Sequence, residues 1–247
     1  MVKGVVLCGG KGTRLRPLTY YFQKTMIPIG PKQKPLLEYI VRLFKYHGIE
    51  DLLFLVNYKA EQILNYFDDG SRFGVRIEYI RDDPSLSGTG GALINAFRKG
   101  YFDKNKDIIV YYGDILSNID LSDMLRFHRE KNALITIGLA RGFKVRVGVA
   151  DIGEDGIVRN FIEKPVLEKP VSIGIYVLSC NIFDMLEDLP SKKEEIDLSG
   201  DVIPHFLKSG RVFGYVSDCF WYDVGSIERY EKLDNKTIER ELGFLFK

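Results

Sequence analysis

The most informative stretch of this sequence is Gly4-Val5-Val6-Leu7-Cys8-Gly9-Gly10-Lys11-Gly12-Thr13-Arg14-Leu15-Arg16-Pro17-Leu18-Thr19. Its apolar run Val5–Cys8 predicts a buried strand that ends in a loop. Glycines just after a strand let backbone N–H groups approach a ligand without obstruction by a Cβ atom, and nearby arginines add fixed positive charge suited to phosphate. The stretch therefore predicts a polyphosphate site. The glycines and arginines concerned are Gly9, Gly10, Gly12, Arg14 and Arg16.

Two better-known phosphate motifs do not fit this loop. A P-loop requires a glycine that is separated by four residues from Gly-Lys-Ser/Thr, but Val5 stands at that position and Gly12 follows Lys11. A dinucleotide fingerprint requires a third glycine three residues after Gly12, where Leu15 stands. An ordinary turn after an edge strand is the alternative, although such a turn needs no neighbouring arginines.

Composition limits the classes of protein to consider. The chain has 247 residues, 45% of them hydrophobic, and a formal net charge of +1. These values fit one large α/β domain or two small ones, and they predict no general attraction to nucleic acid or to a membrane surface. The three widely spaced cysteines predict neither a disulfide framework nor a metal cluster, which favours a cytoplasmic setting. No stretch has the length and apolarity of a signal peptide or a membrane span.

Strand-like and helix-like patterns alternate through the first half of the chain. This alternation predicts an α/β fold with a mostly parallel central sheet flanked by helices, which binds ligands beyond the carboxyl ends of its strands. The Gly9–Arg16 loop and Gly113-Asp114 both follow predicted strands. The expected strands are Val5–Cys8, Leu52–Val56, Val75–Ile80, Ile108–Tyr112 and Leu134–Leu139, and the expected helices are Leu36–Tyr46, Glu61–Phe67, Ala92–Phe97 and Leu121–His128.

The pattern changes after residue 145. Strands with short connections, interrupted by two helices, predict a mixed sheet that extends the same domain and carries a second subsite. The apolar end of the chain is expected to pack on its own body or, alternatively, to form a subunit interface of a homo-oligomer. The expected strands are Val145–Ile152, Ile157–Ile162, Val171–Leu178 and Val212–Val216, with helices near Asn181–Leu186 and Asp201–Leu207.

Two aspartates are candidate metal ligands. Asp114 comes directly after a buried strand, where Mg²⁺ would meet triphosphate oxygens, because Mg²⁺ takes one or two carboxylates together with substrate phosphates. Asp223 lies among aromatic residues and needs a partner once its strand is buried. The alternatives are a helix cap for Asp114 and a hydrogen bond from Ser226 or the backbone for Asp223.

Three further charged residues are candidates for substrate contacts. Glu163 and Lys164 end a strand and would face one site if Pro165 bends the chain, with the carboxylate on sugar hydroxyls and the ammonium on a phosphate. The alternative is a solvated charge pair. Lys24 sits among bulky apolar residues, and because a buried lysine is seldom unpaired, we expect an anionic partner.

Taken together, these motifs resemble the sugar-1-phosphate nucleotidylyltransferases, also called nucleotide-sugar pyrophosphorylases. The resemblance covers nearly the whole chain in order. It includes Gly9–Thr19, Lys24 with Pro28, Lys34-Pro35, Gly88-Thr89-Gly90-Gly91, Gly113-Asp114, Glu163-Lys164-Pro165, Gly174-Ile175-Tyr176 and Asp223-Val224-Gly225.

The resemblance implies a Rossmann-like nucleotidyltransferase fold in a single domain over residues 1–247. The nucleotide subsite would lie mainly in residues 1–140 and the sugar-phosphate subsite mainly in residues 141–230. It further implies that Arg14 and Lys24 are catalytic and that Asp114 and Asp223 bind Mg²⁺. The implied nucleotide-binding residues are Leu7, Gly9, Gly10, Gly12, Thr13, Gly88, Thr89 and Gly113, and the implied sugar-phosphate-binding residues are Gly148, Glu163, Lys164 and Gly174.

The sequence departs from the family pattern at several places. Gln23 stands where proline usually precedes the lysine, and residues 31–35 form a longer loop than usual. Ser172-Ile173 precede Gly174 where Asn-Ala is common, which leaves the sugar open. The left-handed β-helix domain of longer relatives has no counterpart after Asp223.

The implied reaction converts a nucleoside triphosphate and a sugar 1-phosphate to a nucleotide sugar and pyrophosphate. The Gly88–Gly91 segment resembles that of guanylyltransferases, which favours GTP with mannose 1-phosphate over UTP or dTTP with glucose 1-phosphate. The same glycines serve equally well for close helix–sheet packing. Two other possibilities are a regulatory subunit that binds sugar nucleotides without turnover and a transferase acting on a non-sugar phosphate.

Overall fold

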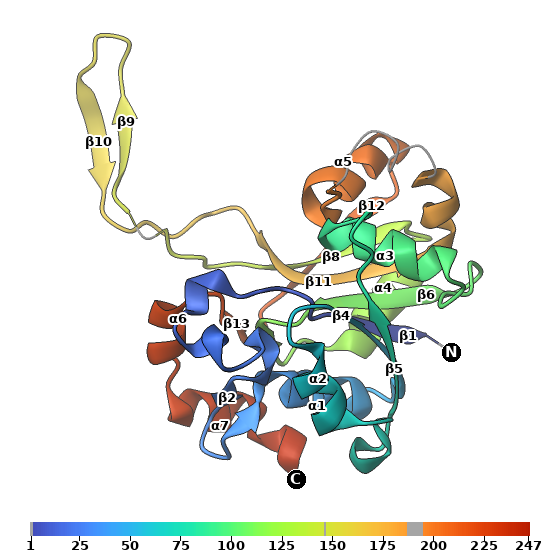
Figure 1. Ribbon diagram of the computed structural model, residues 1–247. Helices are drawn as coiled ribbons and strands as arrows, with labels where there is room; N and C mark the ends of the chain where they lie inside the picture. Colours follow the sequence, from blue (N-terminus) through green and yellow to red (C-terminus); the bar gives the residue numbers. More distant parts are fainter. Residues whose placement is uncertain (1, 146, 187–194) are drawn as a thin grey trace.

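The computed structural model describes residues 2–145, 147–186 and 195–247. Its centre is a seven-stranded sheet in the order β12-β8-β11-β6-β1-β4-β5 (Figure 1). The first strand of the chain lies inside this sheet, paired on both sides, so the loop after it opens from the middle of the molecule. The strands are β1 (Lys3–Leu7), β4 (Asp51–Val56), β5 (Arg76–Arg81), β6 (Asp107–Tyr112), β8 (Ile135–Ala140), β11 (Val171–Ser179) and β12 (Val212–Ser217).

The sheet is mostly parallel, as the alternating pattern predicts. β1 pairs in parallel with β4 and β6, β4 with β5, and β12 with β8. β11 runs antiparallel to both its neighbours, β6 and β8. This reversed strand makes the second half of the sheet mixed, which confirms the predicted change after the first half of the chain.

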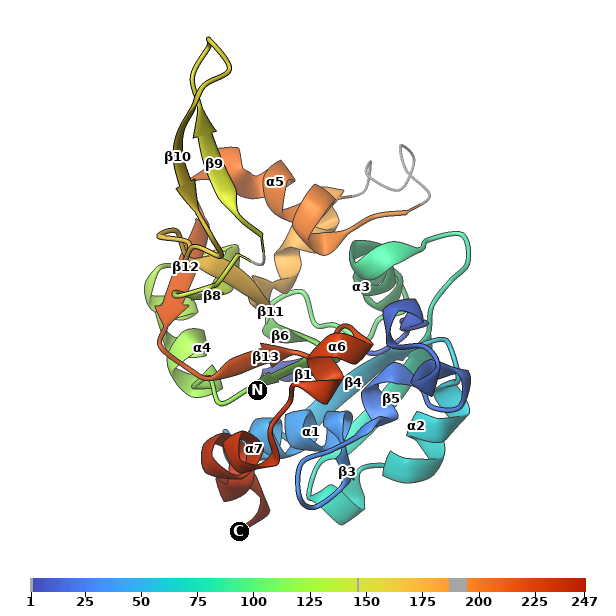
Figure 2. The same cartoon turned by 90° about the vertical axis from the view of Figure 1, so that its left-hand side faces the viewer.

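Helices cover the two faces of the sheet (Figures 1 and 2), and an apolar layer lies on each face. Val6 packs into one layer and Val5 into the other, because successive strand residues point to opposite faces. Helices α1 (Leu36–Tyr46), α2 (Ala60–Phe67), α4 (Leu121–Glu130) and α7 (Asn235–Leu242) contribute to the first layer, and α3 (Gly88–Arg98) and α5 (Ile203–Phe206) to the second. A further short helix, α6 (Ile227–Glu231), lies between α5 and α7 in the sequence.

Three small two-stranded sheets lie outside the central one. β7 (Ile115–Ser117) pairs with β13 (Trp221–Asp223), and β2 (Pro28–Ile29) pairs with β3 (Lys34–Pro35). β9 (Val149–Ile152) and β10 (Val158–Ile162) form a hairpin that projects from the body (Figure 1). The strand expected over Val145–Ile152 begins only at Val149, and the hairpin is not part of the mixed sheet that its sequence position predicts.

Two of the expected helices take tighter or wider turns. The segment expected near Asn181–Leu186 is a 3₁₀ helix over Cys180–Leu186, and the one expected near Asp201–Leu207 is a π-turn, Leu198–Val202, that continues into α5. The apolar end of the chain packs on its own body: Leu242 and Leu245 are buried, and the Phe246 ring meets the edge of Tyr39 at 4.8 Å.

Candidate active site

The glycine loop after β1 is built by close approaches that a side chain would prevent. Gly12 has a left-handed backbone (φ +61°), and a Cβ atom there would lie 2.9 Å from a methyl carbon of Thr19 and 3.0 Å from Cβ of Lys24. The Thr19 hydroxyl donates to the Gly12 carbonyl at 2.9 Å. Gly10, by contrast, faces open space. The loop is therefore folded back against Lys24 and exposes the Gly10 backbone.

A cavity of about 310 Å³ lies beyond the carboxyl ends of β1 and β6. Gly113 brings these ends together, because its N–H donates to the Leu7 carbonyl at 3.0 Å and a Cβ atom would lie 2.8 Å from that oxygen. Several sequence-predicted residues line this cavity, whereas Gly12, Thr13, Arg14 and Gly113 are not among its lining residues. The lining residues are Leu7, Cys8, Gly9, Gly10, Gln23, Lys24, Thr25, Leu55, Asp82, Gly88, Thr89, Ala92, Tyr112 and Asp114.

Lys24 has the anionic partner that its apolar surroundings predict. Its ammonium group forms an ion pair with the carboxylate of Asp114, and the two side chains are 15% and 21% exposed. Such a pair, open on one side to the cavity, presents one cation and one anion to a ligand in the same space. The cap role considered for Asp114 belongs to Asp120, whose carboxylate accepts from the Asp123 N–H at the start of α4.

Gln23 is a site residue that the sequence argument missed. Its side chain is fully buried, donates from Nε2 to the Cys8 carbonyl at 2.5 Å and accepts at Oε1 from the Thr25 N–H at 2.5 Å. It thereby ties the end of β1 to the short 3₁₀ helix Lys24–Met26 that carries the lysine. The clue in the sequence was that glutamine stands where the family has proline. A glutamine side chain has polar atoms that need hydrogen-bond partners.

The β7–β13 pairing brings the two predicted metal ligands together. Asp223 stands opposite Ile115 in that ladder, and the Val224 N–H donates to the Asp114 carbonyl at 2.9 Å. Burial raises the pKa of Asp223, and the neighbouring Asp114 carboxylate raises that pKa further. The positive charges of Arg229, Lys24 and Arg14 lower it. The charges of Asp114, Arg229, Lys24 and Arg14 thus all affect the pKa of Asp223.

The two aspartates fit a divalent cation. Asp223 Oδ2 forms an ion pair with Arg229, but its buried Oδ1 has no hydrogen-bond partner among the described residues. A Cβ atom at Gly225 would lie 2.5 Å from that oxygen, so the glycine keeps the space beside it free. The part of the chain that the structure describes has no group of three or more acidic, histidine or cysteine ligands. Two carboxylates suit Mg²⁺, which completes its shell with phosphates and water.

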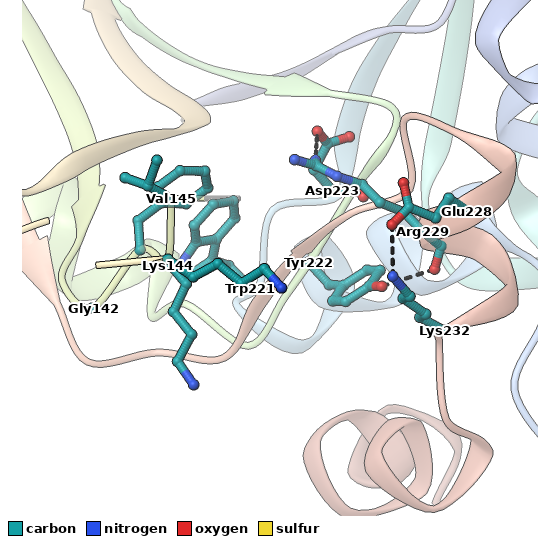
Figure 3. A pocket seen from close by; sticks show the side chains of 11 residues that line it. Gly142, Lys144, Val145, Trp221, Tyr222, Asp223, Glu228, Arg229 and Lys232 are labelled. Carbon is teal, nitrogen blue, oxygen red and sulfur yellow. Dashed lines mark hydrogen bonds and ion pairs between the residues drawn. The ribbon is translucent and has the colours of Figure 1, made fainter. Parts of the chain in front are cut away.

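A second cavity, of about 690 Å³, adjoins this centre on the Asp223 side (Figure 3). Trp221 stacks on Phe143 at one end, with ring centroids 6.2 Å apart and planes 19° apart. Positive charge dominates the walls, where Lys232 is paired with Glu228 at 2.6 Å. The charged lining residues are Lys144, Lys164, Asp223, Glu228, Arg229 and Lys232.

The predicted sugar residues are only partly brought together. Lys164 lines the larger cavity, and the chain bends at Lys164 itself, which has a left-handed backbone (φ +50°). Its ammonium nitrogen lies 3.6 Å from Glu163 Oε1, and both side chains are exposed, as in the solvated pair considered above. Gly148 lies beside Glu163, and neither is among the described residues that line the two cavities. Gly174 lies in β11 against Ile115.

Two of the glycines at the start of α3 serve close packing, but against Ile196 and Leu86 and not against the sheet that the alternative named. The N–H groups of Gly90 and Gly91 both donate to the Ile196 carbonyl, at 2.8 and 3.1 Å. A Cβ atom at Gly91 would lie 2.6 Å from the Leu86 carbonyl oxygen. Thr89, though it lines the cavity, already donates its hydroxyl to Asp197 at 2.8 Å. The space beside Gly90 and Gly91 is therefore filled by protein.

Asp82 is a second residue that the sequence argument missed. It follows β5 directly, lines the smaller cavity and is half-buried, and this burial raises its pKa. A Cβ atom at Gly9 would lie 2.5 Å from Asp82 Oδ2, so the carboxylate reaches the glycine loop. The rule that drew attention to Asp114, a carboxylate just after a parallel strand, would also have found Asp82.

Residues 3–240 match the sequence profile described as nucleotidyl transferase. This chain belongs to that family. This nucleotidyl transferase is 34% identical over 98% of its length to a UTP–glucose-1-phosphate uridylyltransferase from Synechocystis sp., of which the match covers 64%. It is 35% identical over 93% of its length to a mannose-1-phosphate guanylyltransferase from Mycobacterium tuberculosis, of which 62% is covered. The chain thus spans less than two thirds of these relatives.

Solved structures agree with the fold. The nucleotidyl transferase resembles HddC from Yersinia pseudotuberculosis, crystallised with GMP-PN, with a TM-score of 0.70 and 25% identity over 96% of this chain and all of that one. It also shares the fold of a putative glucose-1-phosphate thymidylyltransferase from Bacillus anthracis, with a TM-score of 0.73, 23% identity and coverage of 96% and 95%. Among the described residues, no helix is both long and apolar enough to cross a bilayer.

Proposed function

We propose that this protein transfers a nucleotidyl group from a nucleoside triphosphate to a sugar 1-phosphate. One observation carries the proposal: Lys24, Asp114 and Asp223, with its unpartnered buried oxygen, meet between a glycine-lined cavity and a larger basic one. The family membership and the two sugar-phosphate relatives support the same reaction class. We further propose that the chain is one domain, with the nucleotide mainly on residues 1–140 and the sugar phosphate mainly on residues 141–230.

The reaction needs positioning and charge neutralisation more than covalent chemistry. A phosphate oxygen of the sugar phosphate attacks the α-phosphorus, a new P–O bond forms, and the bond to the bridging oxygen of the leaving pyrophosphate breaks. Lys24 and Arg14 offset the negative charge that gathers on the α-phosphate, and Lys164 holds the attacking phosphate. Asp114 and Asp223 would hold Mg²⁺, which supplies charge stabilisation for phosphate oxygens.

Asp82 favours guanine as the base. Guanine presents two adjacent donors, N1–H and N2–H, that a carboxylate accepts in a bidentate pair, whereas uracil and thymine present one donor between two carbonyl oxygens. A half-buried carboxylate at the glycine loop therefore attracts guanine and repels the pyrimidine carbonyls. Gly90 and Gly91 offer no room for a base, because the space beside them is filled by Ile196 and Leu86.

We propose GTP with mannose 1-phosphate as the substrate pair. The alternative of UTP or dTTP with glucose 1-phosphate corresponds to the relative named as a uridylyltransferase. A regulatory subunit without turnover is disfavoured, because such a subunit does not need the Lys24–Asp114 pair or the free oxygen of Asp223.

Pyrophosphate release over a grid of GTP, ITP, UTP and dTTP with mannose and glucose 1-phosphates tests the proposal. ITP lacks only the N2 amino group, so we expect GTP to exceed ITP in kcat/KM by roughly 10-fold, the size of one lost hydrogen bond to a charged group. Asp82→Asn should remove most of this preference, while its neighbour Asp83→Asn, a matched control, should keep it. Preference for UTP or dTTP would overturn the guanine assignment, and no release with any pair would overturn the reaction class.

A further inference from the structure

The larger cavity, on which the proposed function places the acceptor, has one lysine without an acidic partner among the described residues. Arg229 is paired with Asp223, and Lys232 is paired with Glu228 at 2.6 Å. Lys144 lines the same cavity, and its ammonium group forms no ion pair or hydrogen bond within the part of the chain that the structure describes. Figure 3 shows the two pairs on one side of the cavity and Lys144 on the other. Lys144 is therefore a cation that a ligand can meet on that side.

An aromatic surface adjoins this lysine. The ring of Phe143, the preceding residue, stacks on the ring of Trp221 with planes 19° apart, and both residues line the cavity. Such a surface keeps water away from one side of a ligand, and two opposite charges attract each other more strongly where less water surrounds them. An anionic group beside these rings is therefore held more strongly by Lys144 than it would be by a lysine on an open surface.

Backbone pairing holds Lys144 near the lysine that the proposed function places on the attacking phosphate. Lys144 forms an antiparallel bridge with Val166, and the Val145 N–H donates to the Pro165 carbonyl at 2.8 Å. Lys164 directly precedes this pairing and lines the same cavity. Diagonal neighbours across an antiparallel pair lie roughly 7–8 Å apart, which is close enough for one small ligand to reach both side chains. The two ammonium groups thus suit a ligand with an anionic group at each end.

We propose that this site also accepts sugar 1-phosphates that carry a second anionic group, and that Lys144 recognises this group. The inference rests on the proposed function, in which Lys164 holds the 1-phosphate, and adds a class of acceptor to it. The second anion lies at the end of the sugar ring away from C1 and is either the carboxylate of a hexuronic acid or a phosphate at C6. The reaction is unchanged: an oxygen of the 1-phosphate forms the bond to the α-phosphorus, pyrophosphate leaves, and the second anion takes no part in either bond.

Pyrophosphate release, with the triphosphate that the substrate grid selects, tests the assignment. The acceptors are mannose 1-phosphate, mannose 1,6-bisphosphate and mannuronic acid 1-phosphate, together with their glucose counterparts. The quantity compared is the ratio of kcat/KM for each doubly anionic acceptor to kcat/KM for its parent hexose 1-phosphate. In the wild-type protein we expect at least one of the two anionic classes to equal or exceed its parent. Lys144→Gln should lower that ratio by about 10-fold, the size of one lost hydrogen bond between charged groups, and Lys144→Arg should keep most of it.

Lys208→Gln is the matched control, since Lys208 is exposed and lines neither cavity, and it should keep the wild-type ratio. The acceptor whose ratio falls in Lys144→Gln identifies the second anion as a carboxylate or a phosphate. Release from the plain hexose 1-phosphates with a ratio below about 0.1 for both anionic classes overturns this inference and leaves the proposed function in place. A ratio that Lys144→Gln does not change also overturns the inference, because Lys144 is then only a solvated surface lysine. No release with any acceptor overturns the reaction class and the inference together.

Discussion

Lys24 and Asp114 lie 90 positions apart in the sequence and form one ion pair in the wall of the smaller cavity, beside Asp223, which lines the larger one. The short 3₁₀ helix after the glycine loop carries the lysine, and the end of β6 carries the aspartate. Neither side chain is strongly exposed, so each limits the positions that the other can take. The pair therefore fixes where positive charge stands relative to the carboxylates in the free protein.

Removing the ammonium group tests its role in turnover. We expect Lys24→Met to lower kcat by roughly 10²- to 10³-fold with little change in KM, because its charge matters most as the transition state gathers negative charge. Lys11→Met is the control, since Lys11 is exposed on the same loop. Steady-state pyrophosphate release measures both variants, and a rise in KM at unchanged kcat would place Lys24 in ground-state binding instead.

The ion pair of Arg229 with Asp223 predicts a competition with the cation. Arg229→Gln should tighten the binding of Mn²⁺, used as a paramagnetic probe, by about 10-fold in the absence of nucleotide. The reason is that the substitution removes the positive charge paired with the Asp223 carboxylate. Asp223→Asn should weaken that binding. Electron paramagnetic resonance titration gives both affinities, and Arg240→Gln, on the surface of α7, should change neither. Equal Mn²⁺ affinity in the two site variants and the wild type would contradict the metal assignment.

Gln23 predicts a linked loss of stability and activity. Gln23→Ala leaves the buried Cys8 carbonyl and Thr25 N–H without these partners, so we expect the free energy of unfolding to fall by roughly 2–4 kcal/mol. We also expect kcat to fall, since Gln23 ties the short helix that carries Lys24 to the end of β1. Urea denaturation and steady-state kinetics measure the two effects. Asn65→Ala, on the exposed side of α2, should leave both unchanged, and full stability of Gln23→Ala would show that water replaces the amide.

The buried histidine of α4 predicts a pH dependence of stability. Burial lowers the pKa of His128 from 6.5 to about 4, with Asp107 opposing and Arg129 adding to the shift. Between these values the unfolded chain binds a proton that the folded chain does not, so the free energy of unfolding falls as pH falls from 6.5 to 4, by about 3 kcal/mol over the whole window. Above pH 6.5 the group contributes no slope. Urea denaturation at several pH values should show a flatter dependence for His128→Asn, and an equal slope would assign the effect to other groups.

Local sequence patterns were sufficient to predict most of the central sheet and the helices beside it. The helix expected over Leu36–Tyr46 has those bounds in the structure, because its apolar positions repeat with the helical period. The hairpin β9–β10 could not be placed in the same way. Its alternating residues are those of an ordinary strand, and nothing local in them tells whether the covering surface is the central sheet or lies elsewhere.

For the site, the motifs located candidate residues, but they did not show which of these residues face a ligand. Asp114 and Asp223 were found from their neighbours, yet the unpartnered Asp223 oxygen depends on the absence of a side chain at Gly225, two residues away. The packing of Gly90 and Gly91 depends on Ile196, which the sequence places more than a hundred residues further on. Such long-range contacts decide which glycines face a ligand and which face protein.

The β7–β13 ladder has a consequence for the order in which the protein is made. Synthesis proceeds from the amino end, so the glycine loop, Lys24 and Asp114 leave the ribosome well before Asp223. A nascent chain that ends before β13 contains Asp114 but not Asp223. It therefore cannot bind a cation with both carboxylates. On the proposed function, we therefore expect chains that end before β13 to lack turnover.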